Sequence, residues 1–201
     1  MISIIDYDAG NLKSVEKALV RLGADPVVTR DRDTILSSDH VILPGVGAFG
    51  DAMNRLNEYE LVPVIRETVE RKIPFLGICL GLQLLFDESE ESPGVPGLGL
   101  LKGKIIRIPK KDGIKVPHMG WNSLHFTKKS ALFEGIREES YVYFVHSYYL
   151  RAEDPEVVAA VTEYGTEIHA AVENDRLFAC QFHPEKSSDT GMRILHNFIS
   201  L

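Results

Sequence analysis

The hydrophobic and polar positions in the first half of the chain predict an alternation of short strands and helices. Short β-branched runs are typical of buried strands, and apolar residues three or four positions apart are typical of one face of a helix. We expect strands at residues 2–6, 26–29, 40–43 and 74–78. We expect helices at residues 12–22, at 51–72 with a division near Pro63, and directly after Gly81. This order predicts right-handed βαβ units and a mostly parallel sheet flanked by helices.

The second half of the chain changes to closely spaced strand patterns. The expected strands cover residues 104–108, 141–146, 157–162, 168–173 and 177–182, and a short helix is expected at 192–199. Turn sequences lie between several of these strands, which favours antiparallel hairpins. We therefore expect a single α/β domain over residues 1–201. Its central, mostly parallel sheet would be extended by antiparallel strands in the C-terminal half, or accompanied by a second small sheet.

Composition and charge narrow the class of protein. Hydrophobic residues make up 44% of the chain and charged residues 25%, a balance that allows a full core. The net charge of −7 argues against a nucleic-acid-binding surface over most of the molecule. The apolar stretch 73–86 is shorter than the roughly 18–20 residues of a bilayer span, and the first residues lack a secretory signal pattern. We expect a cytoplasmic protein with two free thiols and no membrane or nucleic-acid partner.

The most specific local feature is the segment Gly77-Ile78-Cys79-Leu80-Gly81, where an expected buried strand meets an expected helix. A Gly-x-nucleophile-x-Gly pattern is typical of a tight elbow that presents a nucleophile, and its glycines allow close backbone approach. The helix N-terminus favours the thiolate form, and the Leu80 N–H would face an oxyanion. The competing interpretation is a buried structural cysteine between two packing glycines.

A base for this thiol is available in His183-Pro184-Glu185, at the end of the last expected strand. In an extended segment, residues two positions apart point the same way, and Pro184 favours an extended backbone. Glu185 could then orient the imidazole of His183, which would accept the thiol proton. Alone, this segment is more typical of a strand-end turn with solvated side chains. Together with Cys79, the catalytic interpretation is favoured.

A second oxyanion donor is expected in the glycine-dense segment Pro44-Gly45-Val46-Gly47. The segment lacks the Gly-Lys-Ser/Thr ending of a phosphate loop, and a plain turn is the alternative. Cys180 has no flanking glycines and is assigned to packing. The remaining histidines have no partner at metal-ligand spacing, so we expect no metal, and we expect no organic cofactor.

These segments resemble the triad-type class I glutamine amidotransferases over nearly the whole chain. Three longer segments, residues 6–11, 117–122 and 143–148, are similar to the glutaminase subunit of imidazole glycerol phosphate synthase. The resemblance implies that Cys79 attacks the side-chain amide of glutamine, that His183 relays protons and that Glu185 orients His183. It also implies an oxyanion hole formed by the backbone N–H groups of Val46 and Leu80.

The resemblance further implies a set of glutamine-binding residues, namely Gly47, Gln83, Glu91, His146, Ser147 and Tyr148. Three of these residues also have a non-functional interpretation. Gln83 and Glu91 could be solvated polar groups, and His146 could be a strand-end histidine with satisfied hydrogen bonds. Two other interpretations stay open at this point: the amidotransferase subunit of another pathway, such as anthranilate or aminodeoxychorismate synthesis, and a non-catalytic binding protein of the same fold.

The partner implied by the resemblance is a separate cyclase with a (β/α)₈-barrel fold, bound as a heterodimer. It would use ammonia to make imidazole glycerol phosphate and an aminoimidazole carboxamide ribotide in histidine biosynthesis. The implied docking residues are Asn11, His118, Met119, Trp121, Asn122, Tyr143 and Lys186. The only tryptophan lies in what reads as a polar loop, which suits a contact, although a tryptophan in the domain core is the alternative. We expect the basic stretch 102–115 to be a solvated hairpin, or else the site of an acidic partner.

Overall fold

The computed structural model describes residues 1–8 and 10–201, and a mixed sheet runs through the centre of this part of the chain. Its strand order is β2-β1-β3-β4-β13-β12-β10-β6-β5, with β11 paired to β12 and β8 paired to β11. Strands β7 and β9 form a separate two-stranded sheet. Ala9, part of the 6–11 segment that carries the resemblance, lies outside the described residues.

The strands have the following bounds: β1 Ile2–Ile5, β2 Pro26–Thr29, β3 His40–Gly45, β4 Phe75–Cys79, β5 Glu88–Ser89, β6 Gly103–Arg107, β7 His118–Ser123, β8 His125–Phe126, β9 Tyr141–His146, β10 Tyr148–Ala152, β11 Val158–Glu163, β12 Glu167–Asn174 and β13 Leu177–Cys180. The α-helices are α1 Leu12–Arg21, α2 Arg32–Leu36, α3 Phe49–Glu58, α4 Leu61–Glu70, α5 Leu80–Leu84 and α6 Ser188–Ile199. Short 3₁₀ turns cover Ala131–Phe133, Pro155–Val157 and Pro184–Lys186.

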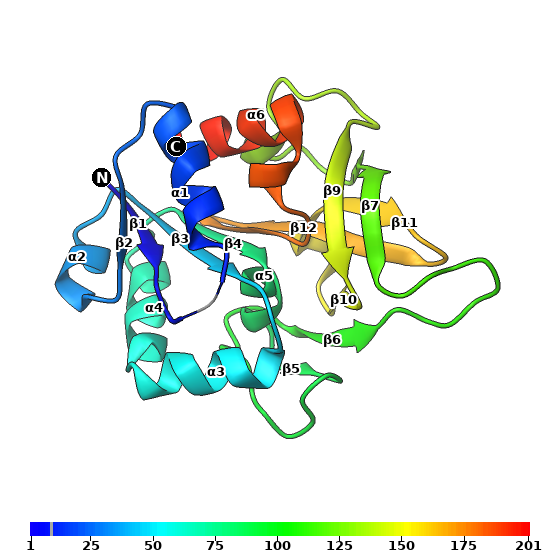
Figure 1. Cartoon of the computed structure of the whole chain (residues 1–201), viewed down its shortest axis with the longest axis horizontal. Coiled ribbons are helices and arrows are strands. Elements are labelled where there is room, and N and C mark those ends of the chain that lie inside the picture. Colours follow the sequence, from blue (N-terminus) through cyan, green and yellow to red (C-terminus); the bar gives the residue numbers. More distant parts are fainter. Residues whose placement is uncertain (9) are drawn as a thin grey trace.

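Helices cover both faces of the parallel part of the sheet, as the apolar runs predict. Strands β2, β1, β3, β4 and β13 pair in parallel. In Figure 1, α1 and α6 lie on one side of these strands, and α3 and α4 lie on the other. Neighbouring residues of β1 point to different cores, because Ile4 packs with Leu19 of α1 whereas Ile5 packs with Leu56 of α3. A strand covered on both faces has no polar side, which explains its uninterrupted apolar sequence.

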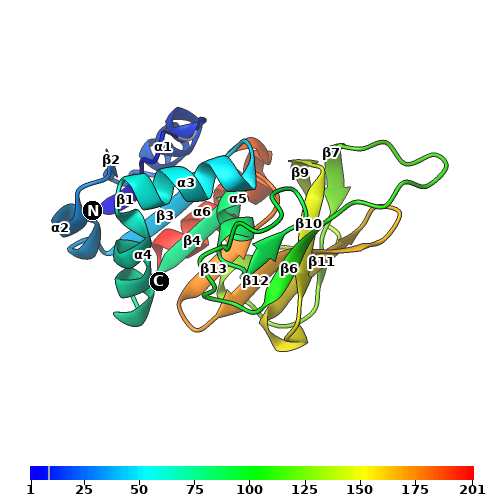
Figure 2. The ribbon, with the colours of Figure 1, turned by 90° about the horizontal axis from the view of Figure 1, so that it is seen from below.

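The antiparallel strands extend this sheet and also form the second one, so both arrangements considered from the sequence occur. Strands β12, β10 and β6 add to β13 in antiparallel order. The β7–β9 pair stands beside them, at the end of the molecule away from α2 (Figure 2).

Several elements differ from the sequence-based expectation. The helix α2, capped by the Asp31 side chain on the Thr34 N–H, and the strand β10 were not expected. Residues 117–122, expected as a polar loop, contain β7. The expected hairpin at 102–115 contains only β6. The division of the 51–72 helix is confirmed, with Pro63 in the first turn of α4, where a missing N–H costs little.

The carboxyl ends of the parallel strands place the chemistry-bearing loops at one edge of the sheet. Strand β3 ends at Gly45, β4 at Cys79, and β13 at Cys180, three residues before His183. The register joins Gly45 to Cys79 and Cys180 to Ile78. Open α/β sheets bind ligands at this edge, so the topology brings the distant candidate residues together. Within the described residues, no helix has both the length and the apolar character needed to cross a bilayer.

Candidate active site

Cys79 lies at a strained turn between β4 and α5. Its backbone has φ 55° and ψ −107°, a conformation that L-residues rarely adopt. The flanking glycines are sterically required, since a Cβ on Gly81 would lie 1.9 Å from the Leu43 carbonyl oxygen and one on Gly77 would lie 2.8 Å from the Gly81 oxygen. The elbow expected from the sequence is confirmed, and the close backbone approach that its glycines allow is visible in these distances.

His183 and Glu185 form a buried pair beside this elbow. The His183 Nδ1 lies 2.9 Å from the Glu185 Oε1, and their side chains are 2% and 1% exposed. Burial by itself lowers the pKa of His183, but the interactions with Cys79 and with the Glu185 carboxylate outweigh it and raise that pKa to about 9. The Nε2 atom has no hydrogen-bond partner among the described residues. It is therefore available for proton transfer in the cavity that His183 lines together with Cys79.

The backbone of this segment differs from the expected extended form. His183 is extended, but a 3₁₀ turn follows over Pro184–Lys186. The Ser187 hydroxyl donates to the His183 carbonyl at 2.6 Å and accepts from the Tyr143 N–H at 2.9 Å. The pairing of His183 with Glu185 thus results from a turn fixed to β9, and not from the alternation of an extended strand.

Asn11, which directly precedes α1, contacts Glu185 of this pair. Its Nδ2 donates to the Glu185 Oε1 at 3.0 Å, which helps to orient the carboxylate toward His183. Asn11 has a left-handed backbone (φ 75°) before α1, a conformation that asparagine tolerates better than most residues. The resemblance assigned Asn11 to a partner surface, and the structure adds this contact with Glu185.

Tyr7 supports the segment expected to provide an oxyanion donor. The Tyr7 hydroxyl donates to the Pro44 carbonyl at 2.9 Å, and the ring is buried. A Cβ on Gly45 would lie 2.1 Å from that hydroxyl oxygen, so only glycine fits there. Burial, and then the proximity of Cys79, raise the pKa of Tyr7. The Tyr7 side chain therefore stays neutral and remains a hydrogen-bond donor beneath this segment.

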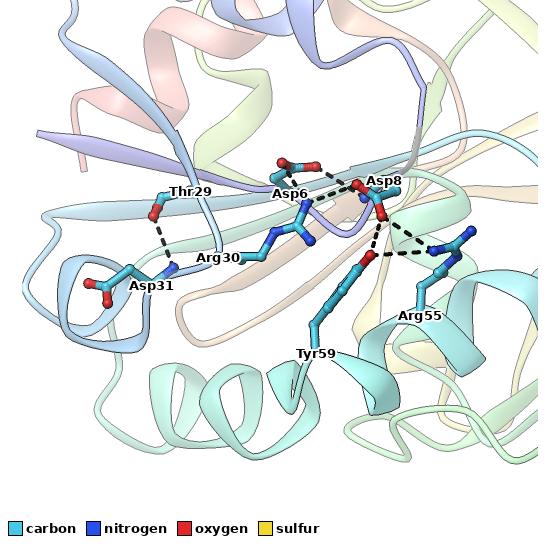
Figure 3. Close-up of polar contacts among 7 residues, drawn as sticks. All are labelled: Asp6, Asp8, Thr29, Arg30, Asp31, Arg55 and Tyr59. Carbon is cyan, nitrogen blue, oxygen red and sulfur yellow. Dashed lines mark hydrogen bonds and ion pairs between the residues drawn. The ribbon is translucent and has the colours of Figure 1, made fainter.

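A network of charged and polar side chains surrounds the loop that carries Tyr7 (Figure 3). Arg30 donates to Asp6 at 2.9 Å and to Asp8 at 2.8 Å. Its guanidinium also lies 4.1 Å from the ring centroid of Tyr59, whose hydroxyl donates to Asp8. Such exposed pairs contribute little stability individually, but together they connect Asp6 and Asp8, on either side of Tyr7, to Arg30 and Tyr59.

A cavity of about 240 Å³ opens at the elbow. Its lining contains both expected oxyanion residues and all six expected glutamine-binding residues, and these are Val46, Leu80, Gly47, Gln83, Glu91, His146, Ser147 and Tyr148. Cys79, His183 and Val145 complete the lining. Residues from five separate parts of the sequence thus meet in one cavity, as the resemblance implies.

Two of the lining residues also have structural contacts. The Glu91 Oε2 accepts the Phe49 N–H at 2.8 Å, at the first residue of α3. The Gln83 Nε2 donates to the Tyr148 carbonyl at 3.0 Å and to the Gln181 Oε1 at 3.1 Å. Neither side chain is the solvated group considered from the sequence.

His146 is buried in a different environment from His183. Its Nδ1 lies 2.9 Å from the Tyr148 carbonyl oxygen, and its Nε2 lies 3.0 Å from the Nδ1 of His118. No carboxylate contributes, and burial lowers the pKa of His146 to about 3 and that of His118 to about 4. Both imidazoles are therefore neutral at physiological pH.

The expected docking residues divide into exposed and buried groups. Met119 and Trp121 of β7 are 63% and 51% exposed, and Lys186 is exposed. The alternative that Trp121 fills the domain core is wrong, because its side chain is exposed. The alternation of a strand turns His118 inward, where it stacks on Tyr164. Asn122 donates to the Glu163 carbonyl at 2.9 Å, and Tyr143 lies edge-on to Trp121.

Sequence reasoning missed three residues next to the reacting groups, namely Tyr7, Gln181 and Ser187. Each acts through contacts between segments far apart in the chain. Tyr7 lies in the 6–11 segment, which carried the resemblance but gave Tyr7 no role, and Gln181 and Ser187 belong to no motif that the sequence singled out. A weak signal existed for Gln181, because a polar residue in an apolar strand end needs a buried partner. In the part of the chain that the structure describes, no three His, Cys, Asp or Glu side chains group as a metal site.

Comparison with known proteins gives a consistent result. A family model described as glutamine amidotransferase class-I matches residues 3–201. The chain is 55% identical over 197 residues to "Imidazole glycerol phosphate synthase subunit HisH" of Moorella thermoacetica, covering 98% of this chain and 93% of that protein. It is 49% identical to the protein of the same name from Methanocaldococcus jannaschii, covering 100% of both.

Solved structures agree on the fold. A crystal structure of a glutamine amidotransferase is similar with a TM-score of 0.77 and 22% identity, covering 99% of this chain and 97% of that chain. The structure of PurLQS from Thermotoga maritima is similar with a TM-score of 0.74 and 20% identity, covering 99% and 97%. At such identities the likeness concerns the fold alone.

Proposed function

The chain belongs to the class-I glutamine amidotransferases, and we propose that it is the glutaminase subunit of an imidazole glycerol phosphate synthase. The names of full-length relatives at 49% and 55% identity support this assignment over anthranilate or aminodeoxychorismate synthesis. The observation that carries the catalytic part is the cavity lined by Cys79 and His183, with His183 held by Glu185. We further propose that residues 1–201 form one such amidotransferase domain.

The proposed reaction is acyl transfer through a thioester. The proton of the Cys79 thiol first passes to His183. The thiolate then attacks the side-chain carbonyl carbon of glutamine, and His183 gives the proton to the amide nitrogen. Collapse of the tetrahedral intermediate releases ammonia and leaves a γ-glutamyl thioester. A water molecule then attacks, with His183 accepting its proton and returning it to the sulfur, so that glutamate leaves and the thiol is regenerated. Glu185 stabilises the imidazolium that forms twice in this cycle.

The oxyanion would be held by the backbone N–H groups of Val46 and Leu80. Both residues line the cavity, and each directly follows the last residue of a parallel strand. Gly47, Gln83, Glu91 and the 146–148 segment would hold the rest of the glutamine. This proposal requires neither a metal nor an organic cofactor.

The partner in this proposal is a cyclase subunit with a (β/α)₈-barrel fold, bound as a heterodimer and receiving the ammonia. Met119 and Trp121, both exposed on β7, fit a contact surface because aromatic and methionine side chains are enriched in interfaces. Lys186, Asn11 and Tyr143 would lie in the same contact. His118 and Asn122 would support it from behind, since both make internal hydrogen bonds.

We also propose a cytoplasmic location. The reaction needs Cys79 as a free thiol, and both cysteines are free. A reducing compartment preserves that state.

The decisive experiment compares Cys79→Ala with the matched variant Cys180→Ala. Cys79→Ala should abolish glutamine-dependent turnover, while added ammonium salts still support the synthase reaction of the purified partner complex. Cys180 is fully buried in β13, and its replacement should keep glutamine turnover within a few-fold of wild type. Glutamine hydrolysis by Cys79→Ala at the wild-type rate would overturn the mechanism.

The partner assignment is tested by the same assay with and without a barrel cyclase and its nucleotide substrate. Stable complex formation and an increased glutaminase rate are expected. A chain that binds an anthranilate synthase subunit instead would contradict the assignment but leave the mechanism intact.

A further inference from the structure

The side chain of Gln181 contacts the sulfur of Cys79. Gln181 lies one residue beyond β13, is completely buried, and places its Nε2 atom 3.7 Å from the Cys79 Sγ. A sulfur atom accepts hydrogen bonds weakly as a thiol and more strongly as a thiolate. Whether an amide helps or hinders the thiolate depends on which end faces the sulfur: the NH₂ group stabilises negative charge, whereas the oxygen opposes it.

The Tyr148 carbonyl decides the orientation of the neighbouring amide of Gln83. This carbonyl can only accept, and the atom of Gln83 that lies 3.0 Å from it must therefore be the NH₂ nitrogen. The same nitrogen lies 3.1 Å from the Gln181 side chain. Because Gln83 donates with both of its hydrogens, the Gln181 atom facing it must be the acceptor oxygen.

The orientation of Gln181 follows from this chain of contacts. With its Oε1 directed to Gln83, its NH₂ group faces the Cys79 sulfur. The carbonyl that fixes this order also accepts from the Nδ1 of His146, and it thus uses both lone pairs. The Tyr148 carbonyl oxygen therefore orients Gln83, and Gln83 in turn orients Gln181 so that its NH₂ group faces the Cys79 sulfur.

We propose that Gln181 is a catalytic residue that donates a hydrogen bond to the Cys79 thiolate, and that Gln83 is the positioning residue that fixes its orientation. The proposal rests on the proposed role of Cys79 as nucleophile. Gln181 provides a neutral donor that stays in place throughout the cycle, unlike His183, whose proton leaves during each transfer. It stabilises the thiolate before attack and again when the thioester is cleaved.

Other titratable groups near the sulfur have to be held constant in any test. His183 follows β13, Tyr7 follows β1, Cys180 belongs to β13 and Glu91 lines the cavity. The Gln181 and Gln83 substitutions themselves replace none of these four residues. A Cys180→Ala background leaves Cys79 as the only thiol, so that alkylation reports on one sulfur.

The test measures the rate of Cys79 alkylation by iodoacetamide against pH, in the full-length chain. Gln181→Met has nearly the same shape but no donor, and we expect the midpoint of its pH profile to rise by about one unit, a tenfold loss of thiolate at a given pH. Asn197→Leu is the control, since the Asn197 amide also donates two hydrogen bonds, to the carbonyls of Leu132 and Glu134, and does not line the cavity. Its midpoint should stay at the wild-type value.

Gln83→Glu gives a readout that a merely structural role would not produce. A carboxylate at position 83 can only accept, and Gln181 would rotate to donate to it, presenting its oxygen to the sulfur. The midpoint should rise in this variant although the hydrogen bonds of the Gln83 side chain go to Tyr148 and Gln181 and not to the Cys79 sulfur. Part of that rise is the added charge, and the charge effect alone should remain in the double variant Gln83→Glu with Gln181→Met.

The possible outcomes distinguish a failure of the roles proposed for Gln181 and Gln83 from a failure of the proposed function. An unchanged midpoint in a folded Gln181→Met protein would overturn the role of Gln181, while loss of glutamine turnover in Cys79→Ala would still support the proposed function. An equal effect of Gln83→Glu with and without Gln181 would show charge alone and overturn the positioning role of Gln83. If Gln181→Met fails to fold, Gln83→Glu and its double variant with Gln181→Ala decide in the same way.

Discussion

Two regions of the cavity hold a buried histidine, and they give it opposite charge states. After β13, His183 faces Cys79 and the Glu185 carboxylate, and these two interactions raise its pKa to about 9 despite burial. At the end of β9, His146 faces a backbone carbonyl and the neutral ring of His118, and its pKa falls to about 3. Both side chains are almost completely buried. Burial alone therefore does not decide the charge of a histidine, because the partner on the ring nitrogen decides it.

This contrast separates a proton carrier from a fixed support. An imidazole that can gain and lose a proton is needed once, beside the sulfur. A second charged ring in the same cavity would oppose the first, and coupling to His183 already disfavours the charged form of His146. The His146 ring instead uses both nitrogens in hydrogen bonds whose direction the Tyr148 carbonyl fixes.

The largest effect is expected from Glu185→Gln, which makes the environment of His183 resemble that of His146. The amide keeps an acceptor for the Nδ1–H but removes the negative charge. The pKa of His183 should therefore fall below about 9, because one of the two interactions that raise it is lost while burial and the interaction with Cys79 remain. Glutamine turnover should decrease on the order of 10³-fold. NMR titration of the ring and a glutaminase assay measure the two effects. A His183 that still titrates near its wild-type value would show that the carboxylate is not the cause.

The sequence predicted the catalytic segments well because their constraints are local. Gly77 and Gly81 report a steric requirement within one turn, and the spacing of His183 and Glu185 limits how far apart their side chains can lie. The β-branched runs of the parallel strands carry their own signal, which is why their bounds differ from the structure by only a few residues.

The contacts around these segments could not be predicted, since they depend on strand order. Gln181 reaches Cys79 only because β13 lies beside β4, in a register that joins Cys180 to Ile78. Strand β7 shows no apolar alternation, and its inward residue His118 is a polar ring buried by Tyr164 and His146. From the sequence alone, a polar ring such as His118 is expected to be exposed, because the residues that bury it, His146 and Tyr164, lie about 28 and 46 positions away.

A smaller effect, on stability, is expected from His118→Phe in the second region. Phenylalanine keeps the stacking on Tyr164 and Phe144 but leaves the His146 Nε2 without its donor. A buried acceptor without a partner costs about 1–3 kcal/mol, which urea unfolding can measure. The exposed His196 provides the control His196→Phe, expected within about 0.5 kcal/mol of wild type. Equal stability of both variants would mean that the imidazole pair contributes nothing beyond packing.

The last prediction is a pH dependence of stability with a separate cause on each side. The pKa of His183 is raised to about 9, so its contribution is fully present below the unfolded value of about 6.5 and is lost as the pH rises toward 9. The pKa values of His146 and His118 are lowered to about 3 and about 4, so their contribution is present above about 6.5 and is lost as the pH falls.

Each histidine can change the slope by at most about 1.4 kcal/mol per pH unit. Urea unfolding between pH 5 and 9 (roughly the window set by these groups) should give the greatest stability near the middle. Glu185→Gln should reduce the slope on the alkaline side only, because it removes the carboxylate that helps to raise the pKa of His183. His118→Phe should reduce the slope on the acid side only, because it removes one of the two histidines whose pKa is lowered. A variant that changes both sides equally would show that the two histidines titrate as one coupled unit, and the distinction between carrier and support would then be wrong.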